Sequence, residues 1–137
     1  MWFIFALLSA VFAALVAIFG KIGIKNLDST LATTVRAFIM FAFLLVVSLS
    51  MGKLHLINTI GARPFKFIML SGIAGAMSWL FYFAALKMGL ASRVASVDRL
   101  SVVFVVIFAA LFLGEVLTLK SALGVIILTL GAIILVW

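Results

Sequence analysis

The last third of the chain, from Val97 to Trp137, consists of two apolar runs separated by a break at Leu113-Gly114-Glu115. A short polar stretch, Thr118-Leu119-Lys120-Ser121, begins the second run. Each run is close to the length that a helix needs to cross a bilayer, and the break is too short to hold more than a turn. This stretch therefore predicts a helical hairpin inside a membrane.

The composition of the whole chain agrees with a membrane location. Apolar residues make up 69% of the 137 residues and charged residues 9%, whereas a soluble domain carries about 25% charged residues. The net charge of +7 would favour nucleic-acid binding in a soluble protein. Here the basic residues lie mostly between apolar runs, where they meet anionic lipid headgroups and set orientation. We therefore expect membrane lipids, and not nucleic acid, as partners.

Apolar runs recur along the entire sequence, and none alternates as a barrel strand would. At ~1.5 Å per residue each run can cross a hydrocarbon core of about 30 Å, the fourth only just. The expected fold is all-α, an integral membrane bundle of five transmembrane helices forming one domain over residues 1–137. The five runs are about Trp2–Phe19, Leu31–Met51, Phe65–Leu86, Val97–Leu113 and Leu119–Trp137.

Short polar sequences predict where these helices begin and end. Asp28, followed by Ser29 and Thr30, is typical of a helix N-cap. Pro64, the only proline, ends any helix that would cross the basic Gly52–Lys66 loop and suits the start of the third helix. Gly114 predicts a left-handed cap at the end of the fourth helix. The stretch Lys87–Ser96 is expected to be a short basic connection.

Arg36 and Asp98 are charged residues that lie within the apolar runs. Arg36 sits about 9 to 12 Å along the second run, where a charge is costly unless it snorkels, finds a partner or contacts an anionic substrate. Its candidate partners are Asp28 and Asp98. Asp98 is expected to open the fourth helix, where the helix dipole stabilises a carboxylate. Ser101 follows one turn later on the same face.

The third run places small residues at one end of a helix face and aromatic residues at the other. Glycines allow a neighbouring helix to approach, and Trp79 and Tyr82 offer ring faces with hydrogen-bonding tips. Such a stripe serves packing or lines a cavity, and Trp79 lies near the middle of the run. The face comprises Gly72, Gly75, Ala76, Trp79, Tyr82, Phe83 and Leu86.

Catalytic and metal-binding residues are scarce. The chain has no cysteine and a single histidine, His55, so it offers no thiolate or histidine-cluster metal site. No nucleophile–base pair or metal-ligand set is present. We therefore expect neither an enzyme nor a cofactor.

The order and spacing of several motifs resemble a known family. They are the stretch from Trp79 to Leu86, the basic turn after it, Val97-Asp98-Arg99-Leu100-Ser101, Phe112-Leu113-Gly114-Glu115, and Gly124 and Gly131 in the last helix. Together with Lys21, Lys25 and Arg36 they resemble the EamA domain of the drug/metabolite transporter superfamily, over essentially the whole chain. One departure is Ser96, where relatives often carry proline. The resemblance implies a carrier of small metabolites, and we expect a multi-pass protein of a bacterial or archaeal plasma membrane.

The resemblance also implies two inverted halves, because most relatives carry two such domains in opposite orientations. Here the basic residues are nearly balanced between the two membrane sides, so their distribution favours one orientation of the chain only weakly. Two oppositely inserted copies would reproduce the inverted repeat of alternating-access carriers. One side carries Lys53, Arg63, Lys66 and Lys120, the other Lys21, Lys25, Lys87 and Arg93, joined by Arg36 and Arg99 if these snorkel to it.

The leading hypothesis is thus a secondary transporter, an exporter or exchanger of a small organic metabolite, that works as an antiparallel homodimer. The alternatives are a membrane assembly or regulatory subunit, and a flippase component for a lipid-linked sugar with a basic headgroup site near Arg63 and Lys66. A proton-driven exporter of the small multidrug resistance kind would need a carboxylate in the first helix, which has none. The predicted solute-binding residues are Trp79, Tyr82, Arg36 and Asp98, with Ser9 and Ser101 as minor polar contacts.

Overall fold

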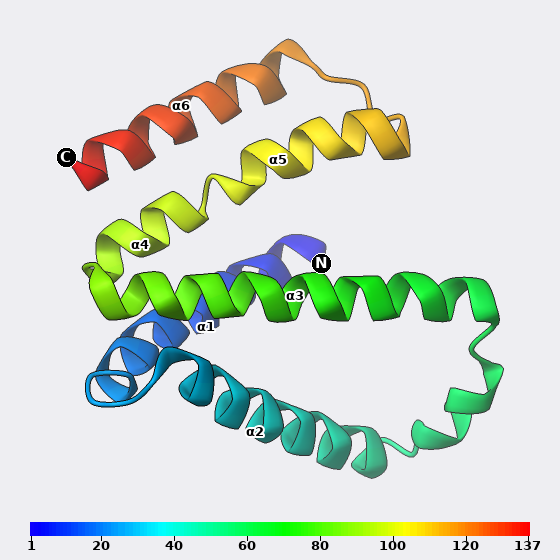
Figure 1. Cartoon of the computed structure of the whole chain (residues 1–137). Helices are drawn as coiled ribbons and strands as arrows, with labels where there is room; N and C mark the ends of the chain where they lie inside the picture. Colours follow the sequence, from blue (N-terminus) through cyan, green and yellow to red (C-terminus); the bar gives the residue numbers. More distant parts are fainter. The chain divides into compact units, whose positions relative to one another are not determined.

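The structure, a computed structural model, describes residues 1–137 and contains helices without strands (Figure 1). Five segments are long and apolar enough to cross a membrane: α1, α2, α3, the stretch Ala91–Leu113, and α6. The predicted all-α fold with five transmembrane helices is therefore confirmed. In chain order the elements are α1 (Trp2–Gly23), α2 (Ser29–Ser50), the 3₁₀ helix η1 (Leu54–Thr59), α3 (Ala62–Met88), α4 (Ala91–Asp98), α5 (Ser101–Phe108), the π-helical turn η2 (Ala109–Leu113) and α6 (Leu119–Val136).

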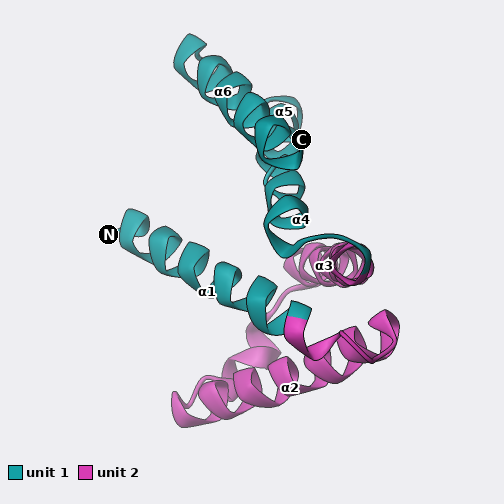
Figure 2. Ribbon diagram, turned by 90° about the vertical axis from the view of Figure 1, so that its left-hand side faces the viewer, with its two compact units in different colours: residues 1–21, 88–137 teal, residues 22–87 magenta.

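The chain divides into two compact units, coloured separately in Figure 2. Unit 1 comprises Met1–Lys21 and Met88–Trp137, and within it α6 packs against both α4 and α5. The predicted hairpin of the last two spans lies in this unit, with Gly114–Thr118 as its connection. Unit 2 comprises Ile22–Lys87 and contains α2, η1 and α3.

The predicted helix caps are confirmed. The Asp28 carboxylate accepts a hydrogen bond from the backbone N–H of Leu31 at 2.9 Å, which satisfies an otherwise unpaired donor at the start of α2. The Thr118 hydroxyl does the same for the N–H of Ser121 at 3.2 Å at the start of α6. Pro64 lies in the first turn of α3, where its missing N–H costs no helical bond.

The fourth span differs from its prediction at its start. Lys87–Ser96 is not a loop, because α3 continues to Met88 and α4 begins at Ala91. Leu90 is extended and accepts the first helical bond, from Val94 N–H to Leu90 O at 3.0 Å. The expectation that Asp98 opens this helix is consequently wrong. Asp98 is instead the last residue of α4, where the helix dipole does not favour a carboxylate.

A break in the helix separates α4 from α5 within the fourth span, and the ribbon leaves the helical path there in Figure 1. After an ordinary helical bond from Arg99 N–H to Ala95 O at 3.2 Å, the next backbone bonds are of the tighter i to i−3 kind. They run from Leu100 N–H to Val97 O at 2.9 Å, from Val102 N–H to Arg99 O at 3.1 Å and from Val103 N–H to Leu100 O at 2.9 Å. The fourth span is thus a discontinuous helix with two charged residues, Asp98 and Arg99, at the discontinuity.

The same span ends in a wider turn. After α5, the π-helical turn η2 leads to Gly114, which has a φ of +70° and is the left-handed cap that the sequence predicts. The N–H of Glu115 then donates to Ala109 O at 3.2 Å and closes the end of the helix. The fourth span is therefore irregular near its middle and at its end.

Candidate functional site

Unit 2 holds the ends of α2 and α3 together at one turn. The side chain of Lys87, near the end of α3, donates a hydrogen bond to the backbone oxygen of Leu27 at 2.8 Å, just before α2 begins. The start of α2 and the end of α3 therefore lie at the same level. Arg36 comes seven residues after Ser29, and Trp79 nine residues before Met88, which correspond to about 10 Å and 13 Å along the two helices. These two residues consequently reach similar depths in the membrane.

At that depth, Arg36 stacks on aromatic rings. The Arg36 guanidinium carbon lies 3.6 Å from the centre of the Trp79 ring and 5.5 Å from that of Phe83. Both distances fall within the range of cation–π attraction, which is stronger away from water. The ring faces thus compensate part of the cost of placing a charge inside a membrane.

The rings that Arg36 contacts belong to a group of three aromatic side chains. Trp79 and Tyr82 meet edge to face with centroids 5.5 Å apart, and Phe83 lies 5.9 Å from Trp79 and 6.2 Å from Tyr82. Phe83 is 3% exposed, so it anchors the group, whereas Trp79 and Tyr82 remain half-buried. We call Arg36, Trp79, Tyr82 and Phe83 the aromatic–cation cluster.

The stacked guanidinium keeps its hydrogen-bonding capacity. Within unit 2 its N–H groups have no acceptor, and the only carboxylate of this unit, Asp28, caps α2. A guanidinium that stacks by its face leaves its N–H donors at the ring edge, where they match a carboxylate or phosphate in a bidentate manner. The cluster therefore combines a charged donor with apolar ring faces.

Asp98, in unit 1, lies at a helix break that falls within the depth of the membrane. The part of the span after the break, from Ser101 to Leu113, has 13 residues and spans only about 20 Å, too little for a hydrocarbon core of about 30 Å. The break must therefore lie inside the membrane. Ionisable residues at such depths are rare and mark solute or ion pathways, and discontinuous helices form binding sites in carriers.

The structure places the sequence-predicted residues in two groups. Arg36, Trp79 and Tyr82 come together in unit 2, while Asp98 and Ser101 flank the helix break in unit 1. Ser9, on α1, is exposed and also belongs to unit 1. The pairing of Arg36 with Asp98 stays a prediction.

One member of the cluster, Phe83, is absent from the predicted site residues. It lies four residues after Trp79 on the same helix face, so its position was visible in the sequence. Its role was not, because an aromatic residue on a packed face gives no sign of contact with a charge.

Comparison with known proteins identifies the family. The chain matches the EamA-like transporter family over residues 1–137. This protein belongs to the EamA-like transporter family. It is therefore a multi-pass membrane transporter and not an enzyme.

A relative of this EamA-like protein has been described from Sinorhizobium sp as an uncharacterized transporter in the cobO 3′ region. The two are 44% identical over 134 residues, which cover 98% of this chain and 95% of the relative. No solved structure matches the chain. The family suggests a small-molecule solute and membrane lipids as partners, in agreement with the sequence prediction.

Proposed function

We propose that this EamA-like protein is a secondary transporter of small organic anions and that the aromatic–cation cluster binds them. The observation that carries the proposal is Arg36, stacked 3.6 Å from the centre of the Trp79 ring with its N–H groups unpaired in unit 2. A solute with a carboxylate or phosphate would receive those N–H groups. Its apolar body would lie against the half-buried rings of Trp79 and Tyr82.

The helix break supplies a second element of the proposed mechanism. Asp98 and Ser101 would contact the solute or a coupling cation as the carrier alternates between its two open states, and Ser9 would add a polar contact from α1. This assignment is supported by the membrane depth of the break and by its position in a discontinuous helix. In this proposal the carrier works as an exporter or exchanger.

We further propose that residues 1–137 act as one domain and that two copies form an antiparallel homodimer in a bacterial or archaeal plasma membrane. The balanced basic residues support mixed insertion. Gly124 and Gly131 on α6 also have no atom within 4 Å of where a Cβ would stand, so a second copy could approach this helix closely.

The solute proposal is tested by measuring ligand-induced thermal shifts on the purified protein with a panel of organic acids, amines and neutral solutes. Arg36→Gln is expected to lower the affinity for the best acid at least about tenfold, because a bidentate charged contact is lost. Arg93→Gln, which removes a basic residue of α4, is the matched control and should leave the affinity unchanged. Equal binding of acids by wild type and Arg36→Gln would contradict the proposal.

The dimer proposal is tested with a reporter fused to the C-terminus whose sidedness is read in cells. A mixture of both orientations is expected. Lys25→Ala should shift the mixture, and Lys25→Arg should not, because orientation follows charge. Lys25 is preferable to Lys21 as the site of substitution. The Nζ of Lys21 donates a hydrogen bond to Gly89 O at 2.7 Å, so changing Lys21 would also remove a structural contact. A single orientation that neither substitution moves would exclude the antiparallel pair.

A further inference from the structure

The connection between α2 and α3 is structured. Gly52, with a φ of +64°, turns the chain at the end of α2, and Lys53 N–H donates back to Ser48 O at 2.9 Å. The 3₁₀ helix η1 follows and ends at Thr59, whose hydroxyl donates to Leu56 O at 2.6 Å. This connection joins two membrane spans, so η1 lies at a membrane surface.

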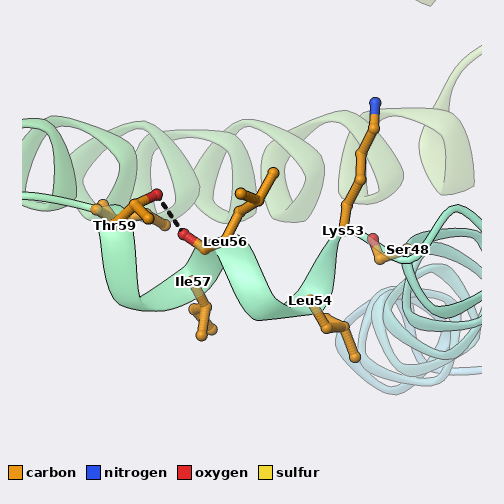
Figure 3. A pocket seen from close by; sticks show the side chains of 7 residues that line it. Ser48, Lys53, Leu54, Leu56, Ile57 and Thr59 are labelled. Carbon is orange, nitrogen blue, oxygen red and sulfur yellow. Dashed lines mark hydrogen bonds between the residues drawn. The ribbon is translucent and has the colours of Figure 1, made fainter.

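The residues of η1 and its flanks sort into three rows, because a 3₁₀ helix has 3.0 residues per turn. Leu54, Ile57 and Ile60 form a wholly apolar row, and these side chains are 36%, 64% and 42% exposed. His55 and Asn58 form a polar row. The third row is mixed, and Figure 3 shows its members Lys53, Leu56 and Thr59 on one side of η1, with Leu54 and Ile57 on the other.

A groove runs along this amphipathic segment. Its volume is about 330 Å³, and it extends from Ser48 at the end of α2 to Ile60. Most of its lining is apolar, with the Lys53 side chain and the hydroxyl groups of Ser48 and Thr59 as polar groups. A ligand that fits this lining carries both an apolar chain and a polar head.

The charge around the groove has one sign. Lys53 lies on the groove, Arg63 and Lys66 follow in the first turns of α3, and no carboxylate occurs anywhere from Ser29 to Val97. None of these three basic side chains has a hydrogen-bond partner in the chain. The groove therefore complements an anionic head.

We propose that this groove binds one anionic glycerophospholipid of the surrounding leaflet. Its phosphate lies against Lys53 on one side of η1, with Arg63 and Lys66 adding to the local positive potential, and its acyl chains cross η1 to the apolar row of Leu54, Ile57 and Ile60 on the other side. The apolar row distinguishes a lipid from a free anion, because a free anion would leave that row facing water. The bound lipid is not cargo, since the groove contains no residue of the aromatic–cation cluster.

The test uses the purified full-length protein and native mass spectrometry, with phosphatidylglycerol and phosphatidylcholine of identical acyl chains as probes. The wild type is expected to retain phosphatidylglycerol in clear preference to phosphatidylcholine. Lys53→Gln should lower phosphatidylglycerol binding about fivefold, the effect of one basic residue at an anionic surface. Ile57→Ser should weaken the binding of both lipids.

Lys120→Gln is the matched control, because Lys120 lies on the same membrane side, at the start of α6, and should have no effect. Thermal unfolding of each variant shows whether it has kept its fold. The proposal is overturned if the two lipids bind equally, if Lys120→Gln matches Lys53→Gln, or if inorganic phosphate displaces the lipid.

Discussion

The third and fourth spans manage charge in the membrane in opposite ways. α3 is one uninterrupted helix of 27 residues, and the charge beside it, Arg36, lies against its aromatic rings. The fourth span carries its own charges, Asp98 and Arg99, at a break in the helix. Aromatic faces can hold a cation without disturbing the backbone. A carboxylate has no such partner, and here it lies at a break in the helix.

The largest effect is expected from a substitution that removes the ring face on which Arg36 stacks. Trp79→Leu should lower the free energy of unfolding by about 2 kcal/mol, the value of a cation–π contact away from water. The matched control is Phe81→Leu, two residues along the same helix and 69% exposed, which should have little effect. Unfolding in mixed detergent micelles measures both. Equal losses would mean that Arg36 gains nothing specific from Trp79.

A smaller effect would show whether the two spans share their charges. If Arg36 and Asp98 pair, Asp98→Ala should destabilise the protein, and exchange of the two charges should restore part of the loss. We expect a double-mutant cycle to give a coupling of at least about 0.5 kcal/mol. Strictly additive losses would mean that Arg36 and Asp98 do not pair. The aromatic rings would then be the compensation for the charge of Arg36, and Asp98 would act only at the helix break.

The smallest expected effect concerns the cap that starts α2 and so sets the depth of Arg36. The hydrogen bond from Leu31 N–H lowers the pKa of Asp28 below its ordinary value of 3.8, and the charge of Lys87 acts in the same direction. A lowered pKa adds stability above the ordinary value, and this is lost as the pH falls through the lowered one.

Thermal unfolding from pH 7 to pH 3 should therefore show a small loss below about pH 4 in the wild type. In Asp28→Asn, which keeps a capping oxygen but does not titrate, that component should be missing. If the two proteins follow the same curve, the carboxylate charge contributes nothing to the cap.

Sequence reasoning found the five spans and their caps because these depend on local rules. Asp28, Pro64 and Gly114 each act through their own backbone neighbours, so their roles were visible from position alone. The length requirement also hinted at the early start of the fourth helix. The run from Val97 to Leu113 is barely long enough to cross, but its polar approach, Ala91–Ser96, hid the helix that precedes it.

The site was predictable in its members but not in its geometry. Arg36, Trp79 and Tyr82 stood out as polar or amphipathic residues inside apolar runs. The stacking of Arg36 on Trp79 was not predictable, because helical periodicity fixes which residues share a face but not how two helices are rotated toward each other. The break at Asp98 was likewise not predictable, because no proline or glycine occurs there in the sequence.

The π-helical turn at Ala109–Leu113 has a consequence for how this chain can vary in length. Such a turn holds one residue more than an α-helical turn, and each helical residue rotates the chain by about 100°. Removing one residue there would convert the turn into ordinary helix and keep the span continuous. The same deletion between Trp79 and Phe83 would swing one ring away from the other and dismantle the stack on Arg36. The deletion of a single residue is therefore tolerable at the end of the fourth span and harmful in the middle of the third.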